Sequence, residues 1–297
     1  MKGIGFFFTF LAIILIYGVG VYVYVKKQTP PPPHHQVRPK ESFAEPSECT
    51  TPFGTLLGVV NGTPAFSNCR RGLRMQWVGY FDFNDPMDVS EPRDATHGKK
   101  FMTAARYTAM DFVMRWFAHN RGLMLTGGKD VESLVQNAAY FYNPAHGTQE
   151  WDAEFIQNHR VGRTPEELTY LRPRVGDIVV YDHDYKQDFP EGHMAVIVGV
   201  ENDIEGAGGP RNFKERLNRM VPPRILYLAE QNFANTPWEG RNYSRIAHFR
   251  WTESSHGGAP EGYVDDPVGP RVLGRLRVGK PRLSRGGKSL YESGDDL

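Results

Sequence analysis

Two polar clusters stand at the ends of apolar runs and could carry out acid–base chemistry. His193 opens the apolar, β-branched run 194–200, a composition typical of a buried strand. A second such run, 225–229, leads directly into the polar triplet Glu230-Gln231-Asn232. A histidine beside an acidic residue from a neighbouring strand supplies two members of a nucleophilic triad. The sequence therefore predicts His193 as a general base and Glu230 as its orienting partner.

The main helix expected from the sequence precedes both strands. Apolar residues recur at helical spacing between Ala109 and Asn120, and Gly122 follows as a C-cap. Thr108 is a suitable N-cap, and Asp111, three residues later, completes a capping-box pattern. The helix is therefore predicted to begin at Ala109, with its N-terminus available to a site.

The remaining segments predict strands around this helix. A second helix is expected over 130–142. Strands are expected near residues 51–60, 175–181, 193–200, 225–229, 246–250 and 271–278. A helix followed by strands spaced by turns predicts an α+β fold, in which the helix packs on an antiparallel sheet.

Composition predicts one globular domain with flanking segments. The chain has 297 residues, of which 40% are hydrophobic and 23% charged, and its net charge is +1. This balance gives no reason to expect a nucleic-acid partner. The predicted organisation is a transmembrane signal anchor at 1–27, a proline-rich linker at 28–46, a globular domain at 47–279 and a disordered tail at 280–297.

The N-terminal segment predicts a membrane anchor. Residues 4–25 carry no charge and are long enough to cross a bilayer as a helix. A cleaved signal peptide is the alternative, but Tyr22-Val23-Tyr24-Val25 offers no small-residue cleavage site and is typical of an interfacial aromatic anchor. The sequence thus predicts a single-pass membrane protein.

The sequence carries opposing signals for the side of the membrane on which the globular domain lies. Lysines directly after the anchor favour a cytosolic body by the positive-inside rule. Cys49 and Cys69 could form a disulfide, and Asn61 and Asn242 head acceptor sequons for glycosylation. Free thiols and chance sequons remain the alternatives. The expectation is a luminal or extracellular globular domain.

A series of short motifs follows in order between Thr51 and Val278. The motifs are Phe53-Gly54-Thr55-Leu56-Leu57-Gly58, Phe112-x-x-Arg115-x-x-x-x-Asn120-x-Gly122, Val175-Gly176-Asp177, Gly192-His193-Met194-Ala195-Val196-Ile197, Ala229-Glu230-Gln231-Asn232 and Val272-Leu273-Gly274. Together they resemble the amidase domain of glutathionylspermidine and trypanothione synthetases, within the CHAP group of papain-like cysteine amidases and peptidases. The resemblance implies a papain-like CHAP fold and a hydrolase that needs no cofactor. The ligase half of those synthetases has no counterpart here.

The resemblance also implies roles for individual residues. His193 falls on the general base and Glu230 on the residue that orients it. The family's nucleophilic cysteine is the first residue of the helix, and here that position is Ala109. Asn232 is grouped with the catalytic residues. The predicted substrate-binding residues are Thr108, Asp111 and Gln231.

Two functional hypotheses follow from the missing cysteine. The first is a membrane-anchored, catalytically impaired amidase-like protein that keeps a pocket for a peptide or a polyamine conjugate. The second is an active C–N amide hydrolase, similar to glutathionylspermidine amidase or a peptidoglycan-type endopeptidase, or an engineered Cys-to-Ala form of one. An active form would need Cys69, which lies beside two arginines, or Thr108 as its nucleophile. A zinc site at His193, with His183, Asp182 and Asp184 as further ligands, is a weaker alternative, and no metal or cofactor is predicted.

Overall fold

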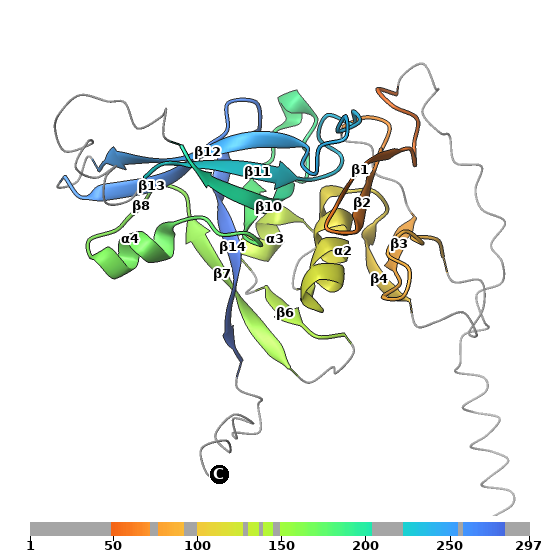
Figure 1. The fold of residues 1–297 in the computed structure, drawn as a ribbon, viewed down its shortest axis with the longest axis horizontal. Helices are drawn as coiled ribbons and strands as arrows, with labels where there is room; N and C mark the ends of the chain where they lie inside the picture. Colours follow the sequence, from red (N-terminus) through yellow and green to blue (C-terminus); the bar gives the residue numbers. More distant parts are fainter. Residues whose placement is uncertain are drawn as a thin grey trace, which may run out of the picture. The chain divides into compact units, whose positions relative to one another are not determined.

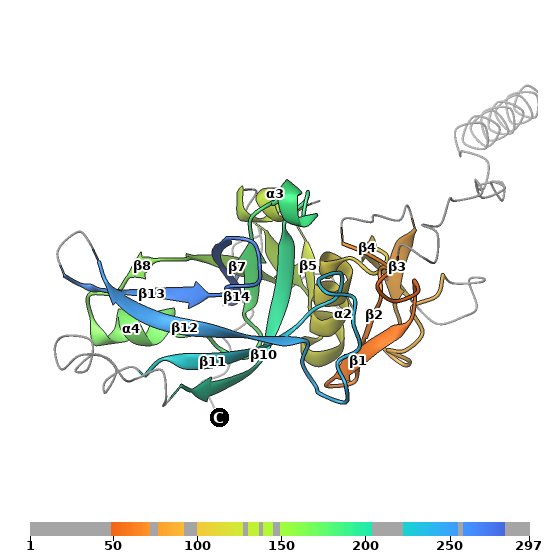
Figure 2. The same ribbon diagram turned by 90° about the horizontal axis from the view of Figure 1, so that it is seen from above.

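A ten-stranded antiparallel sheet dominates the protein (Figures 1 and 2). The computed structural model describes residues 49–71, 77–91, 100–126, 130–136, 139–144, 149–203, 222–254 and 258–282. In the order in which they lie side by side, the strands are β5 (Met124–Thr126), β6 (Tyr140–Tyr142), β7 (Glu150–Gln157), β14 (Val272–Pro281), β9 (Ile178–Tyr181), β10 (His193–Asn202), β11 (Arg224–Ala229), β12 (Arg245–Glu253), β13 (Pro260–Asp265) and β8 (Arg160–Val161). The central strands β9, β10 and β11 are the ones that lead into the predicted site.

Side chains along the central strands point alternately to the two faces of the sheet, and both faces are buried. In β10, Met194 and Val196 pack with residues of helix α2 (Ala109–Arg121). Ala195 and Ile197 point the other way, into a second core with helix α4 (Pro165–Leu171). A strand covered on both faces has to be apolar along its whole length, which accounts for the continuous apolar run that follows His193.

Helix α2 lies between the large sheet and two small hairpins (Figures 1 and 2). The hairpins are β1 (Leu56–Val60) with β2 (Thr63–Phe66), and β3 (Val78–Phe81) with β4 (Phe101–Ala105). The helix begins at Ala109, as predicted, because the Thr108 side chain accepts the N–H of Asp111. It ends at Gly122, whose φ of 64° is the left-handed conformation of a C-cap.

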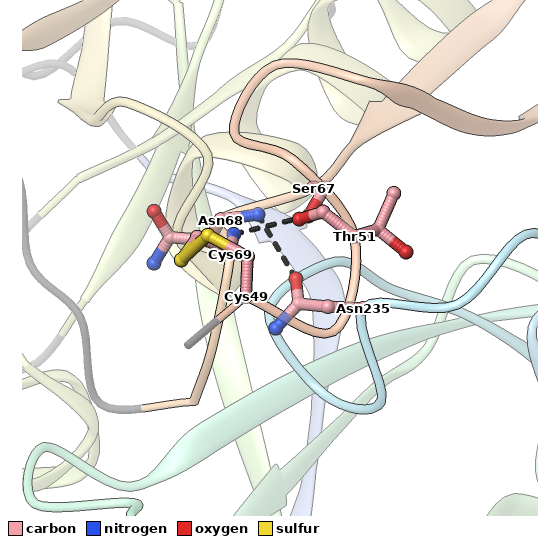
Figure 3. The surroundings of a disulfide bond; sticks show 6 residues. All are labelled: Cys49, Thr51, Ser67, Asn68, Cys69 and Asn235. Carbon is pink, nitrogen blue, oxygen red and sulfur yellow. Dashed lines mark hydrogen bonds between the residues drawn. A yellow bond between two sulfur atoms is a disulfide. The ribbon is translucent and has the colours of Figure 1, made fainter. Parts of the chain in front are cut away.

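Cys49 and Cys69 form a disulfide that closes the loop around the first hairpin (Figure 3). Beside it, the backbone N–H of Asn68 donates to Asn235 Oδ1 at 2.9 Å, which joins this loop to the segment after β11. A cross-link that closes a loop of this length stabilises the fold by about 3 kcal/mol in the chain-entropy model. The bonded Cys69 sulfur is not a thiol, so it cannot serve as the substitute nucleophile considered above.

The predicted α+β fold class, in which a papain-like helix packs on a sheet, is wrong. Strands make up 42% of the described residues and helices 15%. The helix expected over 130–142 is reduced to α3 (Val131–Gln136), and its last residues form β6 instead. The sequence does not predict strands β2, β3, β4, β5, β7, β8 and β13. Their sequences are short or only partly buried, so they lack the long apolar runs by which β10 and β11 could be found.

The predicted membrane span is also corrected. No helix among the described residues is both long enough and apolar enough to cross a bilayer. The longest, α2, is amphipathic and carries charged residues such as Asp111 and Arg115. This finding goes against the single-pass membrane protein predicted above. The segment 4–25 and the linker 28–46 lie outside the described residues, as does the tail beyond residue 282.

A buried ionic cluster fixes the turn that precedes β9. Asp177 is 2% exposed and accepts hydrogen bonds from Arg275 Nη1 at 2.7 Å and from Arg277 Nε at 2.8 Å. Both arginines are on β14 and are themselves buried. One carboxylate therefore neutralises part of the charge of two guanidinium groups and joins the turn to the neighbouring strand.

We expect Asp177→Asn to lower the free energy of unfolding by about 3–5 kcal/mol, because it leaves buried arginine charge without its carboxylate partner. Urea unfolding followed by circular dichroism measures this. The control is Asp265→Asn, which removes a half-exposed partner of Arg250 and should cost at most about 1 kcal/mol. Equal losses in the two variants would contradict a structural role for the Asp177 cluster.

Candidate active site

The structure brings His193 and Glu230 into direct contact. His193 is the first residue of β10, Glu230 follows the last residue of β11, and these two strands pair antiparallel. His193 Nε2 lies 2.8 Å from Glu230 Oε2, and each side chain is only 1% exposed. Two residues that are far apart in the sequence therefore form one buried pair.

Arg245 holds the same carboxylate from its other side. Arg245 Nε donates to Glu230 Oε1 at 2.5 Å, and Ser244 Oγ lies 3.1 Å from that oxygen. Burial alone would raise the pKa of Glu230, but the Arg245 charge and the hydrogen bond from His193 lower it to about 2. An ionised carboxylate only accepts hydrogen bonds, so His193 Nε2 is the donor. In the neutral imidazole, Nδ1 is then the basic nitrogen.

Arg245 is the functional residue that the sequence did not reveal. Its guanidinium also pairs with Asp266 and donates to Tyr181 OH at 2.9 Å. Tyr181 OH in turn donates to Asp266 Oδ2 at 2.7 Å. Only the register of β11 and β12, which sets Leu228 opposite Arg245, shows that this arginine reaches Glu230. The register of two paired strands cannot be predicted from a local sequence pattern.

Aromatic rings enclose the imidazole. The ring centroid of His193 lies 5.7 Å from that of Tyr181, 5.1 Å from Phe189 and 5.4 Å from Phe233. The Arg71 guanidinium stands over Phe189 at 5.1 Å and over Phe233 at 4.8 Å. These rings exclude water from the pair, which strengthens the electrostatic interaction between His193 and Glu230.

A cavity of about 100 Å³ joins the histidine to the start of α2. Its lining includes Thr108, Ala109 and Met110 from the helix N-terminus together with His193 and Asn232. The predicted nucleophile position and the predicted base thus face one space, with Glu230 in contact with the histidine. Ala109 contributes only a methyl group there.

The backbone beside this cavity is held in an uncommon conformation. Tyr107 has a φ of 63° and Asn232 a φ of 60°, both in the left-handed region. For a bulky residue such as Tyr107 this conformation costs on the order of 1–3 kcal/mol. The Asp111 carboxylate stabilises it by accepting the Tyr107 N–H at 3.1 Å and the Thr103 hydroxyl at 2.5 Å. The turn that directs Ala109 into the cavity is therefore fixed by buried polar contacts.

The predicted substrate-binding residues occupy different places. Thr108 lines the cavity, but its hydroxyl donates to Ala105 O at 2.7 Å and accepts the Asp111 N–H at 3.3 Å, so it acts as a helix cap. Asp111 and Gln231 are each 1% exposed and contact each other, with Gln231 Nε2 2.9 Å from Asp111 Oδ2. Gln231 Nε2 also donates to Thr108 O at 2.9 Å. These two side chains position the helix start from behind the cavity.

The other candidate groups lie away from the cavity. His183 pairs with Asp182 at 3.0 Å and is largely exposed. Within the described part of the chain, no group of three or more histidine, cysteine, aspartate or glutamate residues could hold a metal ion. The sequon residues Asn61 and Asn242 are both exposed.

No protein-family model matches the chain, and no curated protein matches it. The resemblance to cysteine amidases therefore depends on short motifs. Two of these, Gly192–Ile197 and Ala229–Asn232, supply the buried pair and part of the cavity lining.

The depressed pKa of Glu230 predicts a defined loss of stability in acid. The carboxylate has a pKa of about 2 in the folded chain and an ordinary value of 4.5. The ionised carboxylate contributes about 3 kcal/mol to the free energy of unfolding. This contribution is complete above pH 4.5, the pKa in the unfolded chain, and it is lost as the pH falls from about 4.5 to about 2. Urea unfolding of Glu230→Gln across this range should show a pH dependence weaker by about that amount. The control is Glu239→Gln, which changes an exposed carboxylate and should leave the pH dependence of stability unchanged. If Glu230→Gln also leaves that pH dependence unchanged, the depressed pKa of Glu230 is wrong.

Proposed function

We propose that the cavity is the substrate site of an amidase-like protein in which the nucleophile is absent. The protein binds a peptide or a polyamine conjugate through this cavity and does not cleave it by thiol chemistry. The observation that supports this most directly is the buried Glu230–His193 pair, which shares a cavity with Ala109 at the N-terminus of α2.

The position of Ala109 is one at which a cysteine would be reactive. At the first turn of a helix, free N–H groups and the macrodipole favour a negative charge and lower the pKa of a thiol. The same N–H groups can stabilise the oxyanion that forms when a carbonyl is attacked. His193 Nδ1, the basic nitrogen of the neutral imidazole, would accept the thiol proton. The surroundings therefore provide every component of thiol catalysis except the sulfur.

The alternative, an active hydrolase with a relocated nucleophile, receives less support from the geometry. The Thr108 hydroxyl is engaged as the helix cap and Cys69 is engaged in a disulfide. Among the described residues that line the cavity, Thr108 is the one with a hydroxyl, and none has a thiol. These contacts support the proposal that the unchanged chain does not cleave an amide.

The test is to restore the sulfur. Ala109→Cys should give a thiol that iodoacetamide alkylates at pH 6.5 at least tenfold faster than free cysteine, because the helix N-terminus and His193 favour the thiolate. The same variant should hydrolyse glutathionylspermidine or a related amide, and the unchanged chain should not. Replacing His193 by Gln in this background should abolish both gains.

The matched control is Pro165→Cys, which places a thiol at the first residue of α4, after a threonine N-cap and outside the lining of the cavity. Its alkylation should be no more than a few-fold faster than that of free cysteine. If both thiols react equally, the helix terminus alone explains the reactivity and the proposed site is wrong. Turnover by the unchanged chain would contradict the proposal directly.

A further inference from the structure

We infer that a second groove, separate from the His193 cavity, binds a small phosphate monoester with an apolar body, and that Arg121 and Arg174 hold its phosphate group. The groove has a volume of about 400 Å³ and includes Phe117 and Arg121 of α2 in its lining. No described residue lines both this groove and the His193 cavity, which lies at the N-terminal end of the same helix. The two ends of α2 are about 18 Å apart at the rise of an α-helix, so this inference does not depend on the proposed function.

Two arginines at the rim of the groove have no acidic partner. Arg121 ends α2, Arg174 begins the turn before β9, and both are exposed. In the described part of the chain neither guanidinium forms an ion pair, and the hydrogen bond from Arg121 Nη2 to Val175 O is long at 3.5 Å. A methyl group at Gly176 would lie 3.3 Å from Arg121 Nη2, so this guanidinium lies against the turn that also carries Arg174. The turn thus brings two positive charges to one groove.

A third arginine of the lining carries charge that the fold compensates only in part. Arg277 is 6% exposed, and its carboxylate partner, Asp177, also pairs with Arg275. One negative charge therefore serves two buried guanidinium groups. Burial and the nearby charge of Arg277 lower the pKa of Arg275 to about 10, although Asp177 opposes this decrease. An anion in the groove would compensate the remaining positive charge.

The balance of charge favours a ligand with two negative charges. The four arginines contribute four positive charges and Asp177 one negative charge, which leaves a net charge of +3 in the groove and directly behind it. A phosphate monoester carries close to two negative charges above pH 7, whereas a single carboxylate carries one. The forked donors of an arginine also match phosphate oxygens in pairs. A phosphate monoester therefore fits the rim better than a monocarboxylate does.

The rest of the lining is largely apolar. Phe117 and Leu123 are buried, Val278 is half-buried, and Val175 is 44% exposed. A phosphate group alone cannot cover these side chains, and a groove of about 400 Å³ has room for a ring or a branched chain beside it. Contact with such a body removes apolar surface from water. These side chains therefore predict that the phosphate is esterified to an apolar group.

The experiment compares three ligands on the full chain by isothermal titration calorimetry at pH 8 in 50 mM NaCl. They are phenyl phosphate, inorganic phosphate, which lacks the apolar body, and benzoate, which keeps the ring but carries one negative charge. Phenyl phosphate should bind about tenfold more tightly than either analogue, because each analogue lacks one of the two features. In 500 mM NaCl its binding should weaken about fivefold, since the rim arginines are exposed. Equal binding of either analogue, no binding of phenyl phosphate, or binding that is insensitive to salt would overturn the inference.

A fourth ligand separates a small molecule from a phosphorylated protein as the source of the phosphate. N-acetyl-phosphotyrosine methylamide presents the same phenyl phosphate on a peptide unit. It should bind no more tightly than phenyl phosphate, since the inference assigns no contact to the peptide unit. Clearly tighter binding would identify a phosphorylated protein as the partner and overturn the small-molecule ligand.

Variants test the two rim arginines. Arg121→Gln and Arg174→Gln should each weaken phenyl phosphate binding about tenfold, because each removes one charge and its paired donors. Neither change breaks an ion pair, so both variants should keep the urea midpoint of the unchanged chain. The control is Arg241→Gln, which changes an exposed arginine outside the groove lining and should leave phenyl phosphate binding unchanged. Unaltered binding by either rim variant, or an equal loss in Arg241→Gln, would overturn the inference.

One further variant distinguishes this groove from the His193 cavity. Ala109→Cys changes the lining of that cavity and no part of the groove, so it should bind phenyl phosphate as the unchanged chain does. A loss of binding in this variant would place the phosphate in the His193 cavity and overturn the inference. Thiol reactivity and amide hydrolysis of the same variant test the proposed function separately, so either proposal can fail while the other stands.

Discussion

The site depends on one carboxylate that is shared between an arginine and a histidine. Burying an ionised group costs several kcal/mol unless it is paired and hydrogen-bonded, and Glu230 meets this condition through Arg245 on one side and His193 on the other. The ends of β10, β11 and β12 must therefore meet at one point in the sheet. Since Arg245 also reaches Tyr181 at the end of β9, four neighbouring strands are aligned by the same charged group.

Three consecutive residues after β11 connect the sheet to the helix. Glu230 contacts His193, Gln231 contacts the start of α2 through Thr108 and Asp111, and Asn232 turns in the left-handed conformation to line the cavity. Successive side chains of an extended segment point in opposite directions, so neighbours in the sequence can hold the base and the helix terminus at once. The relative position of His193 and Ala109 thus depends on Gln231 as well as on the His193–Glu230 pair.

The sequence predicted the parts of the site that depend on local patterns. The start of α2 follows from the Thr108 cap, and the strands of His193 and Glu230 follow from their apolar runs. Long-range register is not a local property, so the pairing of Arg245 with Glu230 could not be found. The same limitation produced the wrong fold class, because half-buried strands such as β7 show no clear periodicity and the short α3 resembled a longer helix.

The cost of the polar cavity itself argues for a ligand. A buried ion pair is weak evidence for stability, since well-packed apolar residues of similar volume are often as stabilising or more so. The strained φ of Tyr107 adds a further cost that Asp111 offsets locally. Neither cost is offset by thiol chemistry in a chain that has Ala109, and both maintain a cavity that His193 lines. Both costs are consistent with the ligand-binding function proposed above.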